Sequence, residues 1–340
     1  MYKLINTTFI LFSFLFITSC NSEEKKVDDK PSTKKLNYID ELNNKLVADP
    51  NNGNLYLERS NYFLEKELYE KAMDDISRAI STDSLNPEFI YAKGNIFFSV
   101  MRFDEATIQF AKCLKIDKSH ANANLKMARI LVHLQQYPAA IKHIDFALKK
   151  NVNLAEAYLL KGIVFQFSGD STAAASSFQT AVEQKGDYYD AYILLGLLYA
   201  SRNDSLAIEY YNSALSLKPS SSEALYNLAI YYQNSKRFTN AFRTYNKLNL
   251  LHPDNEGAYH NKGYMYLVYL NEKEKAIQQF DSALRINPKY LEAFHNRGLA
   301  YRELKKFKEA RADFKSALEI NPQYELSANE LDDMDRKREK

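Results

Sequence analysis

The stretch AFHNRGLAYRELKKFKEARADFKSALEINP, at residues 293–322, contains two helical patterns in succession. Gly298 lies in the first pattern, and in the second Ala310 is followed by Phe314 and then by Ala317. Offsets of four and three residues place side chains on one face of a helix. Small residues on that face let a neighbouring helix approach closely, and Phe314 fills the space between helices. The stretch therefore predicts two packed helices, called here the first and second helix of a repeat.

The same pattern recurs with a period close to 34 residues. The alanine of the second helix recurs with spacings of 34, 34, 34, 33, 34, 35 and 34 residues, at Ala72, Ala106, Ala140, Ala174, Ala207, Ala241, Ala276 and Ala310. The small residue of the first helix is Ser60, Gly94, Ala128, Gly162, Gly196, Ala229, Gly263 and Gly298. Glycine in a helix costs about 1 kcal/mol relative to alanine, so its concentration at one position indicates close helix contact.

These positions resemble the tetratricopeptide repeat (TPR), whose pattern is W-x₂-L-G-x₂-Y…A-x₃-F…P over about 34 residues. The resemblance implies an all-α fold, a solenoid superhelix of about eight helix pairs. It covers eight repeats, at residues 53–86, 87–120, 121–154, 155–188, 189–221, 222–255, 256–290 and 291–324. No repeat has the Trp, the fifth is one residue short and the seventh is one residue long. We expect small irregularities of helix stacking there, without a change of fold.

Helical segments are also expected on both sides of the eight repeats. Residues 36–52 are expected to form a leading half-repeat helix. Residues 325–340 are expected to form a polar helix that caps the last repeat, because a solenoid must cover the apolar face of its terminal repeat.

The N-terminal segment has a different character. Residues 9–17 form an apolar run broken only by Ser13, and this run is shorter than the roughly 20 residues that span a bilayer. It fits the centre of a secretory signal peptide. The ITSC at residues 17–20 resembles the lipobox of bacterial lipoproteins. The resemblance implies that residues 1–19 are a signal peptide and that Cys20 is lipidated. Residues 20–35 would then be the lipidated cysteine and a flexible tether.

Composition and motifs exclude several classes of function. Charges nearly balance, with 45 Lys and Arg against 43 Asp and Glu, so no electrostatic argument favours nucleic acid. The chain has no phosphate-binding loop, metalloprotease motif or nucleophile elbow, and we expect neither catalysis nor a cofactor. His260 and His295 occupy equivalent positions in adjacent repeats, but no carboxylate or cysteine accompanies them in register, so we expect no metal site. Cys113, in the small-residue position of a second helix, is expected to be buried and inert.

In the TPR family, partners bind along the inner faces of the first helices. The corresponding polar and aromatic positions are Tyr91, Asn95, Arg129, Tyr226, Asn227, His260, Asn261, Tyr264, His295 and Asn296. Asn227, Asn261 and Asn296 match the place where relatives hold a bound peptide backbone. The other interpretation, in which this asparagine is only a consensus residue, stays open. The basic clamp by which some relatives bind chaperone tails is absent.

The first helices of the fourth and fifth repeats are apolar nearly all round. We therefore expect an exposed apolar patch at which a partner binds, formed by Leu159, Leu160, Ile163, Ile193, Leu194 and Leu197. The alternative is that the superhelix or a second copy of the chain covers these residues.

These features predict an adaptor in the bacterial cell envelope, anchored through Cys20. The outer membrane is expected, and its periplasmic and surface faces both stay open. The expected partner is another envelope protein or peptide segment, in envelope assembly, secretion or a cell-wall-enzyme complex. The competing interpretation is a glycan-binding or small-ligand-binding protein, or an enzyme, that uses the tyrosine-rich groove. Homo-oligomerisation also stays open.

Overall fold

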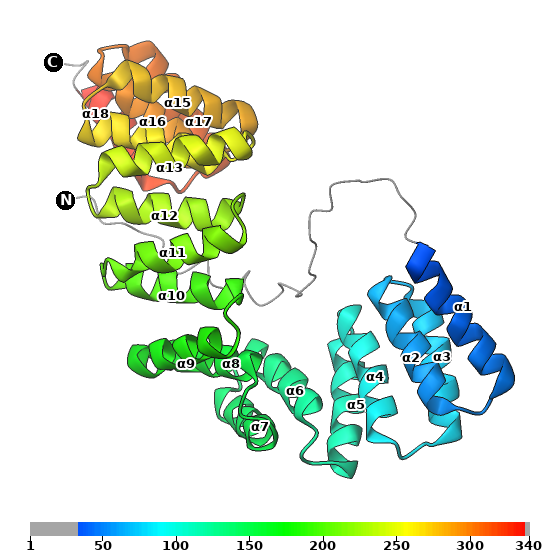
Figure 1. Cartoon of the computed structure of the whole chain (residues 1–340). Coiled ribbons are helices and arrows are strands. Elements are labelled where there is room, and N and C mark those ends of the chain that lie inside the picture. The colour runs from blue at the N-terminus through cyan, green and yellow to red at the C-terminus, as the bar shows by residue number, and fades with distance from the viewer. Residues whose placement is uncertain (1–32, 337–340) are drawn as a thin grey trace. The chain divides into compact units, whose positions relative to one another are not determined.

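The computed structural model describes residues 33–336, and all regular structure within them is helical (Figure 1). The expected signal peptide, Cys20 and most of the expected tether lie outside the described residues. The chain divides into two compact units, one ending at Lys185 and the other beginning at Gly186. Across residues 33–336, no helix combines the length and the apolarity needed to cross a membrane.

Unit 1 consists of a leading helix and four antiparallel helix pairs. Its helices are α1 (Thr33–Ala48), α2 (Gly53–Glu65), α3 (Tyr69–Thr82), α4 (Pro87–Ser99), α5 (Phe103–Ile116), α6 (Ala121–His133), α7 (Tyr137–Lys150), α8 (Ala155–Phe167) and α9 (Ser171–Gln184). Each first helix packs most extensively against the second helix that follows it.

Unit 2 consists of four helix pairs and a final helix. Its elements are α10 (Tyr189–Ser201), α11 (Leu206–Leu217), α12 (Ser222–Asn234), α13 (Phe238–Leu251), α14 (Glu256–Tyr264), the π-helix η2 (Met265–Tyr269), α15 (Lys273–Ile286), α16 (Leu291–Glu303), α17 (Phe307–Ile320) and α18 (Glu325–Arg336). The predicted all-α solenoid of helix pairs is confirmed.

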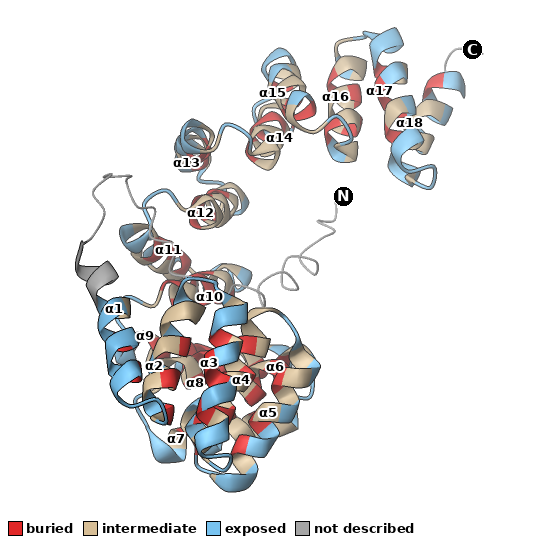
Figure 2. Ribbon diagram, turned by 90° about the vertical axis from the view of Figure 1, so that its right-hand side faces the viewer, coloured by how far each residue is buried: buried red, intermediate tan, exposed pale blue. Residues whose placement is uncertain are grey.

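Small residues make the close helix contacts that the sequence predicts. All eight second-helix alanines are fully buried. At Gly162 of α8, an added Cβ would lie 2.4 Å from the ring of Phe178 in α9, which is itself fully buried. Buried residues therefore lie on the faces that helices turn toward one another, and exposed residues lie on the outside (Figure 2). Cys113 is buried as predicted, and burial raises the pKa of its thiol to about 12.

The turn inside each repeat uses one residue with a left-handed backbone. These residues are Glu67, Met101, Gln135, Gly169, Asn203, Lys236, Asn271 and Lys305, with φ between 54° and 81°. The loops that lead into the next repeat instead supply caps. Asn86, for example, accepts a hydrogen bond from the N–H of Glu88 at the start of α4, which satisfies one of the unpaired donors at a helix N-terminus.

The irregular repeats keep the fold and adjust locally. The extra residue of the seventh repeat falls between Gly263 and Ala276 and is accommodated in η2, where the N–H of Leu270 donates to the carbonyl of Met265 at 3.2 Å. In the fifth repeat, α11 has 12 residues, whereas α9 has 14. Neither change alters the all-α fold, as expected from the sequence.

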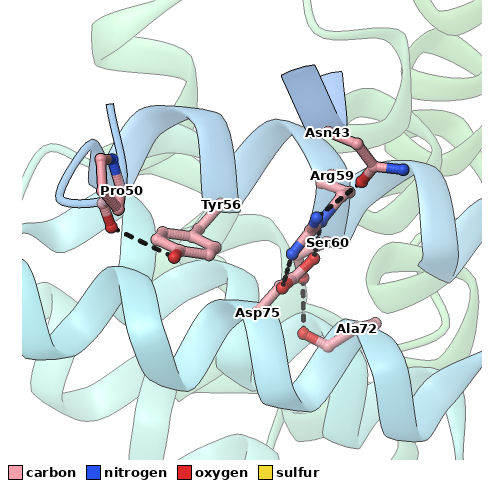
Figure 3. A network of polar contacts seen from close by, with 7 residues as sticks. All are labelled: Asn43, Pro50, Tyr56, Arg59, Ser60, Ala72 and Asp75. Carbon is pink, nitrogen blue, oxygen red and sulfur yellow. Dashed lines mark hydrogen bonds and ion pairs between the residues drawn. The ribbon is translucent and has the colours of Figure 1, made fainter. Parts of the chain in front are cut away.

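The first helix of the structure, α1, takes the place of a second helix from a preceding repeat. Arg59 in α2 donates through Nε and Nη2 to Asp75 and through Nη1 to Asn43 in α1, at 2.6, 2.7 and 2.7 Å (Figure 3). In the eighth repeat, Arg297 makes the same three contacts, to Asp313 in its own repeat and to Asp281 sixteen residues earlier. Asn43 of α1 thus corresponds to Asp281 of α15.

The last helix, α18, occupies the place of a further first helix. Its Ser327 is fully buried, and the Ser327 Oγ lies 3.0 Å from Nδ1 of His295 in α16. Met334 packs with Ala310 and Phe314 of α17. This helix therefore covers the apolar face of the eighth repeat.

Candidate functional site

Three successive first helices of unit 2 carry a connected polar network, called here the unit 2 ladder. In α16, Asn296 donates through Nδ2 to Nε2 of His260 in α14, at 2.9 Å. Nδ1 of His260 lies 3.3 Å from Oδ1 of Asn261. Asn261 in turn donates through Nδ2 to the hydroxyls of Tyr226 in α12 and Tyr245 in α13, at 3.2 and 3.1 Å. The ladder therefore brings together four of the predicted site residues, namely Tyr226, His260, Asn261 and Asn296. Its fifth residue, Tyr245, was not among those predicted.

The environment of the ladder favours neutral groups. Burial lowers the pKa of His260 to about 4, so the ring is neutral near pH 7. A neutral ring with the proton on Nδ1 fits both contacts, because Nδ1–H can then donate to Asn261 while Nε2 accepts from Asn296. Burial also raises the pKa of Tyr226 and of Tyr245. The ladder therefore offers hydrogen-bonding groups without net charge.

His295 has an equivalent setting with different partners. Its ring lies 5.7 Å from Phe314 and 5.4 Å from Tyr324, as His260 lies 5.7 Å from Phe280 and 4.9 Å from Tyr290. Burial, with a contribution from Arg302, lowers the pKa of His295 to about 4. Within residues 33–336 no group of three or more His, Cys, Asp or Glu side chains is placed to hold a metal ion.

In unit 1, two predicted site residues lie near one carboxylate. Arg129 in α6 donates through Nη2 to Oε1 of Glu156 in α8, at 2.6 Å. Burial raises the pKa of Tyr91 in α4, and the charge of Glu156 adds to this effect. The Tyr91 ring also packs 4.9 Å from the ring of His120. Tyr91, Arg129 and Glu156 thus form a second group of interacting side chains.

Three further predicted residues are Asn95, Asn227 and Tyr264. The hydrogen bonds and ring contacts described above do not join them to either network. Asn95 is half-buried, and its backbone carbonyl accepts a hydrogen bond from Ser99. Asn227 is half-buried on α12. Tyr264, also half-buried, lies edge to face with Tyr269 at 5.9 Å, beside the π-helix.

The prediction of an exposed apolar patch in the fourth and fifth repeats is wrong. The exposed fractions are 7% for Leu159, 2% for Leu160, 0% for Ile193 and 4% for Leu194, while Ile163 and Leu197 are half-buried. Leu160 belongs to a core cluster with residues of α6 and α7, and Ile163 packs against that cluster. A helix that is apolar nearly all round packs most of its surface against neighbouring helices. Leu194, which is 4% exposed, is therefore part of the core and does not offer a surface to a partner.

Sequence reasoning missed the acidic residues of the first helices. Glu223 in α12 accepts a hydrogen bond from the hydroxyl of Tyr189 at 3.2 Å, and burial raises its pKa to about 7. Glu156, which holds Arg129, has the same place in its own helix. The signal was an acid in the first turn of successive first helices, which is a favourable place for negative charge. It recurs at Glu88, Glu156, Asp190, Glu223, Glu256 and Glu292.

Comparison with family models agrees with this architecture. Models described as tetratricopeptide repeats match residues 159–206, 223–255 and 291–324, and one described as a TPR repeat matches residues 267–305. The chain therefore contains tetratricopeptide repeats, and the resemblance to this repeat that the sequence shows is confirmed.

Two curated relatives match short stretches. Over 90 residues, 26% of this chain, it is 33% identical to a UDP-N-acetylglucosamine–peptide N-acetylglucosaminyltransferase of Giardia intestinalis. Over 58 residues, 16% of this chain, it is 45% identical to tetratricopeptide repeat protein 6 of Homo sapiens. The matched stretches span only 6% and 11% of the lengths of these relatives.

Among solved structures, PilF of Pseudomonas aeruginosa has the same fold, with a TM-score of 0.54 and 15% identity over 59% of this chain and 92% of that one. The TPR repeats themselves support a protein-interaction scaffold, since stacked repeats present extended binding surfaces.

Proposed function

We propose that this protein is a lipid-anchored scaffold that binds a segment of another cell-envelope protein on the faces of its first helices. The observation that carries the proposal is the unit 2 ladder. It sets neutral amide, phenol and imidazole groups along three successive first helices, α12, α14 and α16. Such groups match the donors and acceptors of a polypeptide backbone.

The anchor is proposed from the N-terminal sequence. The apolar run ending in ITSC supports a lipidated Cys20, followed by a polar segment that leads to α1. Several acyl chains on one cysteine would hold a protein durably on a membrane, whereas one chain holds it only marginally. A scaffold held in this way would work beside partners of the same membrane.

The glycan-binding alternative receives no comparable support. An aromatic sugar platform needs open ring faces, but the rings of Tyr211 and Tyr245 are buried. The matched stretch of the Giardia transferase gives no residue of this chain a catalytic role.

The test is capture of partners from native envelopes with two matched variants. Asn227→Arg places a long cation on the first-helix face of α12, and Asn212→Arg places the same side chain on the exposed surface of α11. We expect Asn227→Arg to reduce recovery of the partner at least tenfold and Asn212→Arg to leave it unchanged. Equal recovery with both variants, at unchanged thermal stability, would place binding elsewhere.

A further inference from the structure

An apolar pocket of about 610 Å³ opens in unit 1 between the second and third repeats. Its lining comes from α4, α5, α6 and the turns that follow α4 and α6. Three lining residues are more than half exposed, namely Met101 at 58%, Ile108 at 52% and Leu134 at 55%. The volume lies within the range of roughly 300–1,000 Å³ typical of small-molecule sites.

One wall of this pocket is polar and cationic. Arg129 of α6 lines it, and Lys126, one turn earlier, places its Nζ 4.7 Å from the ring centre of Phe98, another lining residue. Burial lowers the pKa of Lys126; the charge of Glu156 opposes this effect, and the charge of Arg129 adds to it. The two cations, Arg129 and Lys126, share a single neighbouring carboxylate, that of Glu156. One of the two positive charges is therefore left without a counterion in this group.

The guanidinium of Arg129 is only partly satisfied. Its Nη2 donates to Glu156, while its Nε is buried without a hydrogen-bond partner among the described residues. Arg129 lines the pocket and has donors beyond the one that Glu156 accepts from, so an anion in the pocket would accept charge-assisted hydrogen bonds from it. Asp104 also lines the pocket, but it is exposed in the first turn of α5, where water screens its charge.

We propose that this pocket binds a monoanionic amphiphile, a long-chain carboxylate whose apolar tail lies among Met101, Ile108 and Leu134 and whose headgroup accepts hydrogen bonds from Arg129. The unpaired positive charge selects a single anion. The apolar lining selects a tail, because each buried CH₂ group adds to affinity. The site is separate from the unit 2 ladder and does not depend on the proposed partner binding.

Dodecanoate, titrated into the full chain below its critical micelle concentration, tests the proposal by calorimetry. We expect saturable binding with one site per chain. Dodecyltrimethylammonium, with the same tail and opposite charge, and hexanoate, with the same headgroup and a shorter tail, should each bind at least tenfold more weakly. Arg129→Gln should weaken dodecanoate binding about tenfold, through loss of charge-assisted hydrogen bonds.

A pair of isoleucines on α5 provides the matched control. Ile108 lines the pocket and is 52% exposed, whereas Ile116 does not line it and is 43% exposed. Both can be replaced by Gln without opening a buried core. Ile108→Gln should weaken dodecanoate binding at least threefold, and Ile116→Gln should leave it unchanged. Absence of saturable binding, equal effects of the two variants, or equally tight binding of dodecyltrimethylammonium would overturn the proposal.

Discussion

Asn296 donates a hydrogen bond to Nε2 of His260 at 2.9 Å, joining the first helices of two successive repeats in unit 2. The bond requires an unprotonated Nε2, which fits the pKa of His260, lowered by burial to about 4. The same contact therefore links the eighth repeat to the seventh and fixes the tautomer of a histidine on the proposed binding face. The side-chain amide of Asn296 therefore already makes one hydrogen bond within the protein.

The buried histidines predict loss of stability in acid. The pKa of His295 falls from 6.5 to about 4 on folding, so the unfolded chain binds the proton first. Stability from this residue is present above about pH 6.5 and is lost as the pH falls toward 4. At pH 5 the loss is about 2 kcal/mol. Glu223 acts in the opposite direction, because its pKa of about 7 means that stability falls as the pH rises from about 4.5 to 7.

A variant separates the two effects. His295→Phe keeps an aromatic ring beside Phe314 and Tyr324 but cannot be protonated. Urea unfolding of both proteins at about pH 7.5 and pH 5 should show that the wild type loses about 2 kcal/mol more than the variant. Identical pH dependence of the two proteins would contradict the assignment of His295 as a buried neutral group.

The close contact at Gly162 predicts a large effect of one methyl group. Its added Cβ would meet the fully buried ring of Phe178 at 2.4 Å, so Gly162→Ala should destabilise unit 1 by about 1–3 kcal/mol. Gly186→Ala is the control, since nothing lies within 4 Å of a Cβ there. Thermal or urea unfolding of the two variants measures the difference. Equal midpoints would mean that the helices are not packed as closely as described.

The Arg59–Asp75 ion pair predicts how α1 is held. Arg59→Met leaves the carboxylate of Asp75, whose side chain is 5% exposed, without its partner and removes the bond to Asn43. Such a buried unpaired charge costs roughly 3–5 kcal/mol. Hydrogen exchange should therefore accelerate across α1, α2 and α3.

The double variant Arg59→Met/Asp75→Leu checks the cause. It removes both charges, and replacing a buried ion pair with apolar residues is often neutral. Exchange rates close to wild type are expected. If the double variant exchanges as fast as Arg59→Met, packing by the arginine side chain, not the unpaired charge, holds these helices.

The arrangement of helices was predictable because each contact depends on residues at fixed spacing. The alanine and glycine positions predicted eight pairs, and Gly162 against Phe178 shows the contact that this spacing encodes. The extra residue of the seventh repeat was also visible in the sequence. The sequence did not show that the π-helix η2 would accommodate this residue. One extra residue fits either a longer loop between the two helices or a wider helical turn.

The binding surfaces were less predictable. Leu160 and Leu194 were expected to be exposed but are buried. The helical periodicity of a sequence does not show how many neighbouring helices surround a given helix. The pocket beside Arg129 was missed because it depends on space left between side chains of three helices. The ladder was partly anticipated, as Asn261 and Asn296 lie at equivalent positions of adjacent repeats and His260 directly precedes Asn261.

The proposed anchor predicts a chemical modification at one cysteine. Cys20→Ser should abolish incorporation of an alkyne-bearing palmitate analogue and should leave an unprocessed precursor. Cys113→Ser is the matched control, because Cys113 is fully buried and its thiol has a raised pKa. Label retained on Cys20→Ser, or lost from a stable Cys113→Ser protein, would contradict lipidation at Cys20.

Photo-crosslinking in intact cells tests the central claim most directly. A benzophenone side chain is placed at Asn227, on the first-helix face of α12, or at Lys247, exposed on the second helix α13. If the first-helix face holds the partner, irradiation should give one discrete adduct from position 227 and none from position 247. No adduct from position 227, or the same adduct in equal yield from both positions, would contradict binding on that face.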